Sequence, residues 1–140
     1  MVGMDNSHAL AQKLHNLSAL LARESDQILQ ERLGIGLSQY KILASVAENP
    51  RLQQRAIAVE LGQTEASVSR QVKLLLAKGM ITSRKNPANR REHLTELTPK
   101  GERVCEAAAQ SLATYHRSLT GHLSPRQQEI LLGLLADLQP

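Results

Sequence analysis

Residues 54–78, QRAIAVELGQTEASVSRQVKLLLAK, decide the fold of this chain. Residues 53–61 form a short, alanine-rich stretch with helical character, and Gly62 ends it in the position that a left-handed C-cap requires. Thr64 then offers an N-cap for a further helix over residues 65–78. Two short helices joined by a tight turn that contains glycine predict a helix-turn-helix.

The second of these helices has one apolar face and one polar face. At 100° per residue, Val68, Val72 and Leu75 fall together and are the expected buried face. Small and basic residues occupy the opposite face and its flanks, where they suit close approach to a DNA major groove. We expect contacts to DNA from Thr64, Ala66, Ser67, Ser69, Arg70 and Lys73. A surface helix with incidental polar residues is the alternative interpretation.

The periodicity changes after Gly79, which ends the helix. Residues 80–85 and 92–97 each predict a short strand, with a turn over residues 86–89 between them. The resulting β-hairpin contributes the remaining expected DNA contacts, which are Arg84, Lys85, Asn89, Arg90 and Arg91. We expect Arg90 to enter a minor groove, where a narrow groove enhances the negative potential, and Arg91 to bond back to the protein. The opposite assignment of the two arginines stays open.

Longer helices flank this central part. Apolar residues at steps of three and four predict a helix from about residue 7 to 33: Leu10, Leu14, Leu17, Leu21 and Ile28. Ser38 is the expected N-cap of a second helix of about ten residues, which Asn49-Pro50 closes. Thr98-Pro99 and Ser124-Pro125 each place an N-cap and an N1 proline before a further helix.

The two terminal helical segments carry continuous apolar faces. In a monomer they would expose Leu10, Leu14, Leu17, Leu131, Leu134 and Leu138. This patch is larger than monomeric proteins usually expose, so we expect an obligate homodimer.

Composition restricts the class of protein. The 140 residues are 41% hydrophobic and 21% charged, which indicates one globular domain. Only Tyr40 and Tyr115 are aromatic, so the core must use Leu, Ile, Val and Ala, and this favours a mainly α fold. A single cysteine, Cys105, excludes an intramolecular disulfide and a cysteine-based zinc site, and favours the cytoplasm. We expect neither a secretion signal nor a membrane span.

Catalytic patterns are missing from the sequence. It has no glycine-rich phosphate loop, no nucleophile elbow and no histidine pair at i and i+4, so we expect no enzyme, no cofactor and no metal site.

Basic charge is concentrated in the centre of the chain. Between residues 64 and 103, nine Lys and Arg residues oppose four Glu residues, so this segment carries +5 while the rest of the chain carries −1. Such a segment suggests a surface that binds a polyanion, although a solvated basic surface is the alternative.

The motifs together resemble the MarR family of winged helix-turn-helix regulators. The resemblance rests on residues 54–78 with Ser67-Val68-Ser69-Arg70, on Lys78-Gly79-Met80-Ile81, on Asn89-Arg90-Arg91 and on Leu97-Thr98-Pro99-Lys100-Gly101. It implies a dimerisation region over residues 1–37 and 99–140 and a winged helix-turn-helix over residues 38–98. It also implies a homodimer that binds double-stranded DNA, usually as a repressor released by a small-molecule effector or by oxidation.

Some positions depart from the family pattern. Asn89 stands where the family commonly has Asp, so an Asp–Arg salt bridge is replaced at best by a weaker neutral hydrogen bond. Leu74 and Leu76 are apolar where the family commonly has charged or polar residues. Cys105 lies in the fifth helix, whereas the peroxide-sensing branch carries its reactive cysteine in the first, so we interpret Cys105 as a core residue and a redox sensor as the alternative.

Two functions from different classes remain at this stage. The first is a sequence-specific, DNA-binding repressor that acts as a homodimer on a pseudo-palindromic operator. The second is a winged-helix module that binds proteins and does not read DNA. Cations on both the recognition helix and the hairpin favour the first, because a protein-binding module has no need of Arg70, Lys73, Arg90 and Arg91.

Overall fold

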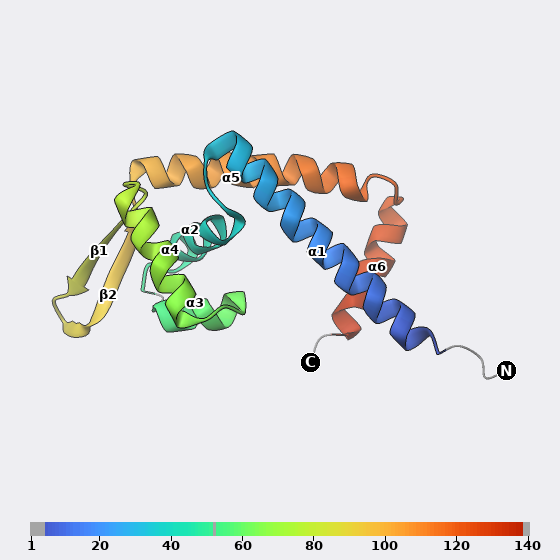
Figure 1. Cartoon of the computed structure of the whole chain (residues 1–140), viewed down its shortest axis with the longest axis horizontal. Helices are drawn as coiled ribbons and strands as arrows, with labels where there is room; N and C mark the ends of the chain where they lie inside the picture. Colours follow the sequence, from blue (N-terminus) through green and yellow to red (C-terminus); the bar gives the residue numbers. More distant parts are fainter. Residues whose placement is uncertain (1–4, 52, 139–140) are drawn as a thin grey trace.

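The computed structural model describes residues 5–51 and 53–138, and within that part it contains six helices and one two-stranded antiparallel sheet (Figure 1). The elements are α1 (Asn6–Leu33), α2 (Leu37–Glu48), α3 (Gln54–Leu61), α4 (Glu65–Ala77), β1 (Ile81–Asn86), β2 (Asn89–Leu97), α5 (Pro99–Thr120) and α6 (Pro125–Asp137). The mainly α fold with a two-stranded hairpin is therefore confirmed.

The elements form one lobe, made of α2 to β2, and three further helices that extend away from it. In Figure 1, α5 runs along the top of the molecule, with α2, α3, α4 and the hairpin beneath its first half and α6 turning down from its end. Helix α1 leads away from α2 towards the end of the molecule where α6 lies. We call α2 to β2 the reading lobe, and we call α1, α5 and α6 the terminal helices.

Local signals in the sequence set most helix ends. Thr64 Oγ1 accepts a hydrogen bond from Ser67 N at 3.1 Å, and Ser124 with Gln127 forms a complete capping box at the start of α6. Gly62 ends α3 with φ 64°, a left-handed conformation that glycine adopts without strain. These caps are confirmed as the sequence predicts them.

The start of α2 corrects one prediction. Ser38 is not the N-cap, because α2 begins at Leu37 and Gly36 takes the cap position without a side-chain hydrogen bond. The carboxylate of Asp26 on α1 accepts from Leu37 N at 2.9 Å instead. A side chain distant in sequence has thus replaced the local cap, which leaves the Ser38 hydroxyl free to bond to Gln63 at the turn between α3 and α4.

The hairpin corrects a second prediction. Strand β2 begins at Asn89 rather than Glu92, so Arg90 and Arg91 lie on a strand and only Pro87 and Ala88 connect the two strands. Ladder pairing extends from Ile81 opposite Leu97 to Asn86 opposite Asn89, with an irregularity after Lys85. That irregularity accommodates three extra residues on β2, which the alternation of apolar and polar side chains does not reveal.

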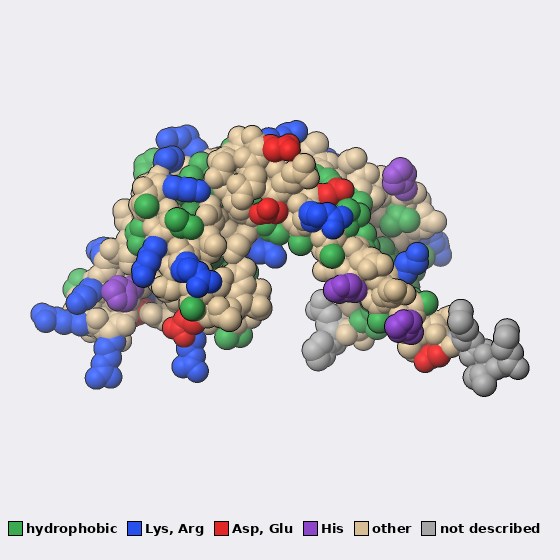
Figure 2. Space-filling view, in the orientation of Figure 1, with side chains coloured by type: hydrophobic (Ala, Val, Ile, Leu, Met, Phe, Trp, Pro, Cys, Tyr) green, Lys and Arg blue, Asp and Glu red, His purple; other side chains and the backbone are tan. Residues whose placement is uncertain are grey.

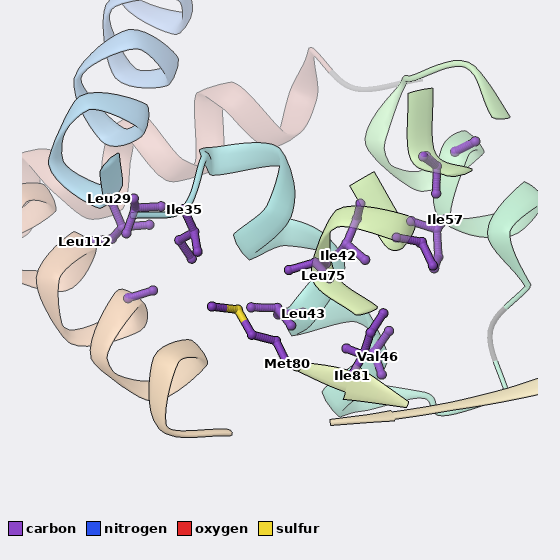
Figure 3. Packing of buried hydrophobic residues seen from close by; sticks show 14 residues of the cluster. Leu29, Ile35, Ile42, Leu43, Val46, Ile57, Leu75, Met80, Ile81 and Leu112 are labelled. Atoms are coloured by element: carbon purple, nitrogen blue, oxygen red, sulfur yellow. The ribbon is translucent and has the colours of Figure 1, made fainter. Parts of the chain in front are cut away.

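One apolar core extends from the reading lobe into the terminal helices. Figure 3 shows Leu29 beside Leu112 at one end, Met80 near Leu43 in the middle, and Ile57 at the far end. Among the described residues fourteen hydrophobic side chains are buried, and the largest of those with almost no exposed surface are Leu29, Ile35, Ile42, Leu43, Val68, Leu75 and Ile81. Burial of this surface holds α1, α2, α4 and α5 together.

The distal half of the terminal helices has no such core. Helix α6 buries no residue, and large apolar side chains are exposed on α1, on α6 and at the C-cap of α6: Leu10, Leu14, Leu17, Ile130, Leu131, Leu132, Leu134, Leu135 and Leu138. None of the described helices combines the length and apolar character needed to cross a membrane.

Candidate nucleic-acid interface

Helix α4 is held by its apolar face and presents its polar face to solvent. Val68 and Leu75 are fully buried and Val72 nearly so, whereas Ala66, Arg70 and Lys73 are exposed. Ser67 and Ser69 lie between the two faces and are half-buried. The predicted division of this helix into a core face and an outward face is confirmed.

The outward face of α4 is sterically and electrostatically suited to a duplex. In its first turn Ala66 and Ser67 are short and follow the exposed Thr64 cap, so the backbone at these residues can approach a groove closely, whereas Glu65 in the same turn is exposed and acidic. Arg70 and Lys73 add positive charge one and two turns further along. An α-helix of this width fits the major groove of B-DNA.

The hairpin carries four cations in different surroundings. Arg84 Nη2 lies 3.5 Å from Glu96 Oε1, and both side chains are more than half exposed, so this ion pair is weak and easily exchanged for a phosphate. Lys85 is exposed opposite His93. Arg90 and Arg91 are exposed on β2, and neither guanidinium donates a hydrogen bond to another of the described residues.

Asn89 shapes the backbone of the hairpin. Its side-chain oxygen accepts from Arg91 N at 3.2 Å, so the amide is bonded to the backbone of Arg91 and not to its guanidinium. Asn86 likewise accepts from Ala88 N and donates to Glu92. Which of Arg90 and Arg91 enters a groove therefore stays a prediction.

The two sets of predicted residues lie on one lobe. Figure 2 shows several Lys and Arg side chains projecting from the reading lobe and its hairpin, while fewer are visible at the opposite end of the molecule, among histidine and apolar side chains. The structure thus brings the α4 residues and the hairpin residues to the same end, with α4 and β1 in direct sequence and in contact.

Sequence reasoning missed one functional candidate, Gln39. It occupies the first place of the buried pattern 39, 42, 43 and 46 on α2, where the other three residues are Ile42, Leu43 and Val46. A polar residue on an apolar helical face was the available signal. In the structure Gln39 is 8% exposed and bonds to Gln71 and Lys78 of the helix-turn-helix.

A helix-turn-helix whose second helix presents a basic outward face, followed directly by a basic two-stranded hairpin, defines a winged helix-turn-helix protein. The family model described as MarR family matches residues 33–92, which span the end of α1 to the middle of β2. The chain belongs to the MarR family.

Relatives support this membership along the chain. A putative transcriptional regulatory protein for the hcr operon of Thauera aromatica is 30% identical over 105 residues, which are 75% of this chain and 63% of the relative's length. The multiple antibiotic resistance protein MarR of Salmonella typhimurium is 29% identical over 135 residues, 91% of each chain. A mutant MarR from E. coli, solved in complex with operator DNA, superposes with a TM-score of 0.74 at 26% identity, over 91% of this chain and 94% of that one.

This chain is therefore a DNA-binding transcriptional regulator and not an enzyme, and the alternative of a module that does not read DNA is set aside. Two side chains remain unexplained. Leu74 and Leu76 are 47% and 38% exposed on α4, and nothing in the structure accounts for their apolar character.

Proposed function

We propose that this protein is a homodimeric repressor that binds a pseudo-palindromic operator and releases it when a small molecule binds. The observation that carries the proposal is the opposite character of the two ends of the molecule. One end presents basic side chains on α4 and the hairpin, and the other presents unpaired leucines on α1 and α6. A second copy that covers the leucines gives a protein with two reading lobes.

The dimerisation region of the proposal comprises residues 1–37 and 99–140, and the winged helix-turn-helix comprises residues 38–98. Leu10 is 62% exposed and Leu134 is 58% exposed, in helices that bury little or nothing at these ends. Leucines in such numbers need an apolar partner, and a closed two-fold dimer pairs the same patch on both copies.

In this dimer, α4 enters the major groove and the hairpin follows the backbone into the adjacent minor groove. We assign the α4 contacts to Thr64, Ala66, Ser67, Ser69, Arg70 and Lys73, and the hairpin contacts to Arg84, Lys85, Asn89, Arg90 and Arg91. Two-fold symmetry of the protein requires two-fold symmetry of the operator, with half-sites about one helical turn apart or a multiple of it. The E. coli relative solved with operator DNA supports this arrangement.

A cavity of about 330 Å³ at the junction of α1, α2 and α5 suits the effector. Its lining includes Leu21, Ser25, Tyr40, Lys41 and His116. Burial raises the pKa of Tyr40, so its hydroxyl stays neutral and can donate a hydrogen bond. An apolar wall with a nearby lysine favours a small amphipathic molecule with an anionic group.

The test is selection from random duplexes followed by salt titration. We expect enrichment of an inverted repeat, and log affinity that falls steeply with log salt because several Lys and Arg residues displace counterions from phosphates. Scrambled duplexes of the same composition are the control. Equal affinity for selected and scrambled duplexes would contradict the proposal.

The effector is tested by displacement. Phenolic compounds, with and without a carboxylate, and peroxides are screened for release of the selected operator. We expect release by a small organic anion, and Lys41→Met is expected to weaken that release while leaving DNA binding intact. Release by none of these compounds would contradict the ligand-responsive part of the proposal.

A further inference from the structure

A polar network connects the recognition helix α4 to the junction of α1 and α2. Gln39 Nε2 donates to Gln71 Oε1 at 3.0 Å, and Lys78 Nζ donates to Gln39 Oε1 and to the carbonyl of Gly34, each at 3.1 Å. Gly34 is the C-cap of α1, Gln71 lies in the middle of α4, and Lys78 is the C-cap of α4. Gln39 on α2 contacts Gln71 and Lys78, and Lys78 continues the network to Gly34 at the end of α1.

The orientation of the Gln39 amide is determined by its partners. Lysine can only donate, so the amide atom that faces Lys78 must be the oxygen, and the nitrogen must face Gln71. Both functional atoms of a side chain that is 8% exposed are thus used. An apolar residue at this place would bury equally well, because Ile42 and Leu43 on the same face do so.

Further polar contacts hold both ends of α4. Just before the helix, Gln63 Nε2 donates to Ser38 Oγ at 2.8 Å, and Ser38 Oγ donates to Gln63 Oε1 at 3.1 Å. At its end, Lys100 Nζ on α5 donates to the carbonyl of Lys78 at 2.8 Å, and Thr98 Oγ1 donates to the carbonyl of Gly79 at 2.6 Å. The exit of α4 is therefore bonded to both α1 and α5, which belong to the proposed dimerisation region.

Apolar contacts between α2 and α4 resist separation of the helices but are non-directional. Hydrogen bonds depend steeply on angle and therefore also resist rotation and sliding of one helix on the other. In a dimer the direction of each α4 relative to the terminal helices sets the distance and rotation between the two recognition helices. We propose that Gln39 is a positioning residue that fixes this direction and thereby the half-site spacing that the dimer accepts.

This inference rests on the proposed function, because it needs a dimer on two half-sites. One inserted base pair moves the second half-site by about 3.4 Å along the DNA and by about 35° around it. A rigid pair of recognition helices cannot follow this change, whereas a loosened pair can. Removal of the network should therefore relax spacing preference rather than simply weaken binding.

The test uses the selected operator and versions with one base pair inserted or removed between the half-sites. We expect the wild type to lose roughly tenfold or more in affinity on each altered spacer, comparable to one mismatched base pair. Gln39→Met keeps the side-chain length without the amide and is expected to lose only about threefold. Gln27→Met is the matched control, because Gln27 is exposed on α1 and bonds only to Glu31 among the described residues, and it should keep the wild-type ratio.

Lys78→Met is the second variant, and it decides the question if Gln39→Met does not fold. Lys78 is half-buried, so its loss is less disruptive, and its lost charge affects all spacers equally and cancels in the ratio. Dimer mass and thermal unfolding are measured for each variant. Folded, dimeric variants with the wild-type spacing ratio would overturn the positioning role alone, whereas a wild type that binds two half-sites no better than one would overturn the proposed function and this inference with it.

Discussion

Leu75 and Leu134 are the same residue type in α-helices of 13 residues, yet Leu75 is fully buried and Leu134 is 58% exposed. Leu75 lies on α4 and belongs to the buried core. Leu134 lies on α6, which buries no residue at all. The reading lobe thus completes its core within one chain, while the distal terminal helices present a face that only another molecule can cover.

This difference separates the stability of each folded chain from the stability of the association between two chains. Substitutions in the core of the reading lobe act on the folding of each chain, so at a fixed protein concentration they lower the free energy of unfolding and leave the mass of the dimer unchanged. Substitutions on the exposed leucines act on association, and their effect depends on protein concentration by mass action. Mutations in each part should therefore be distinguishable by the measurement that they change first.

The largest effect is expected from a charge on the exposed face of α6. Leu134→Glu removes two leucines from a symmetric interface, which loses about 3–6 kcal/mol of association free energy at about 1.5–3 kcal/mol for each side chain. The dimer dissociation constant should rise more than about 100-fold. Light scattering at micromolar concentration should give about one chain mass instead of two.

The matched control is Leu132→Glu. Leu132 is also exposed on α6 but lies outside the stripe of Leu131, Leu134 and Leu138, so its substitution should leave the mass of the dimer unchanged. A folded wild-type monomer at the same concentration would remove the basis for the comparison.

The next largest effect is expected from a substitution in the buried core of the reading lobe. Leu75→Ala should lower the free energy of unfolding by about 2–5 kcal/mol, because it removes a fully buried side chain and leaves a cavity. Urea unfolding measures this change. Leu74→Ala is the neighbouring control at a 47% exposed position, and it should change the unfolding free energy by less than about 1 kcal/mol. Equal losses for the two variants would show that Leu75 is not the better packed.

The sequence predicts helix caps and buried helix faces better than it predicts polar contacts between distant elements. Caps at Thr64, Thr98 and Ser124 and the buried face of α4 follow from local pattern, because neighbouring residues determine them. The cap of α2 does not, because Asp26 reaches Leu37 from eleven residues away. Gln39 was missed for the same reason, since its partners are 32 and 39 residues distant.

The candidate site shows the same limit. The predicted outward face of α4 is found as expected, because helical periodicity determines it. The placement of Arg90 and Arg91 on a strand was not predicted, because an irregular strand pairing near Lys85 cannot be read from alternation. Contact of any of these residues with DNA stays a prediction.

Within the reading lobe, Arg70 should carry sequence preference. Arg70→Ala is expected to cost roughly 1–3 kcal/mol on the preferred operator and to relax preference at one base position in each half-site. Dimer mass and unfolding should stay at the wild-type values, because the side chain is exposed and outside the core. Binding to a randomised operator library measures the preference, and a uniform loss on all sequences would contradict the assignment.

Arg90 should have a smaller and less specific effect. Arg90→Ala is expected to weaken binding to many sequences, most of all with A·T-rich flanks, and to reduce the slope of log affinity against log salt by about one for each subunit. Arg91→Ala is the comparison that decides which arginine enters the groove, because the two are neighbours on β2 and equally free of side-chain hydrogen bonds in the described residues. A changed preference at a single base pair would reverse the roles of Arg70 and Arg90.

The smallest effect is expected at Cys105, which lies on α5 where the core of the reading lobe meets the terminal helices. Burial raises the pKa of the Cys105 thiol, so at neutral pH it stays protonated and is a poor nucleophile towards peroxide. Cys105→Ser should therefore leave DNA binding and its response to peroxide unchanged.

Because the folded state disfavours the thiolate, the thiol stabilises the fold fully below the unfolded-state pKa, and this contribution is lost as pH rises through the higher folded-state pKa. Unfolding of the wild type and the serine variant at neutral and alkaline pH measures the difference, which should narrow or reverse only at alkaline pH. Release of operator DNA by peroxide from the wild type but not from the serine variant would make Cys105 a sensor and would contradict this prediction.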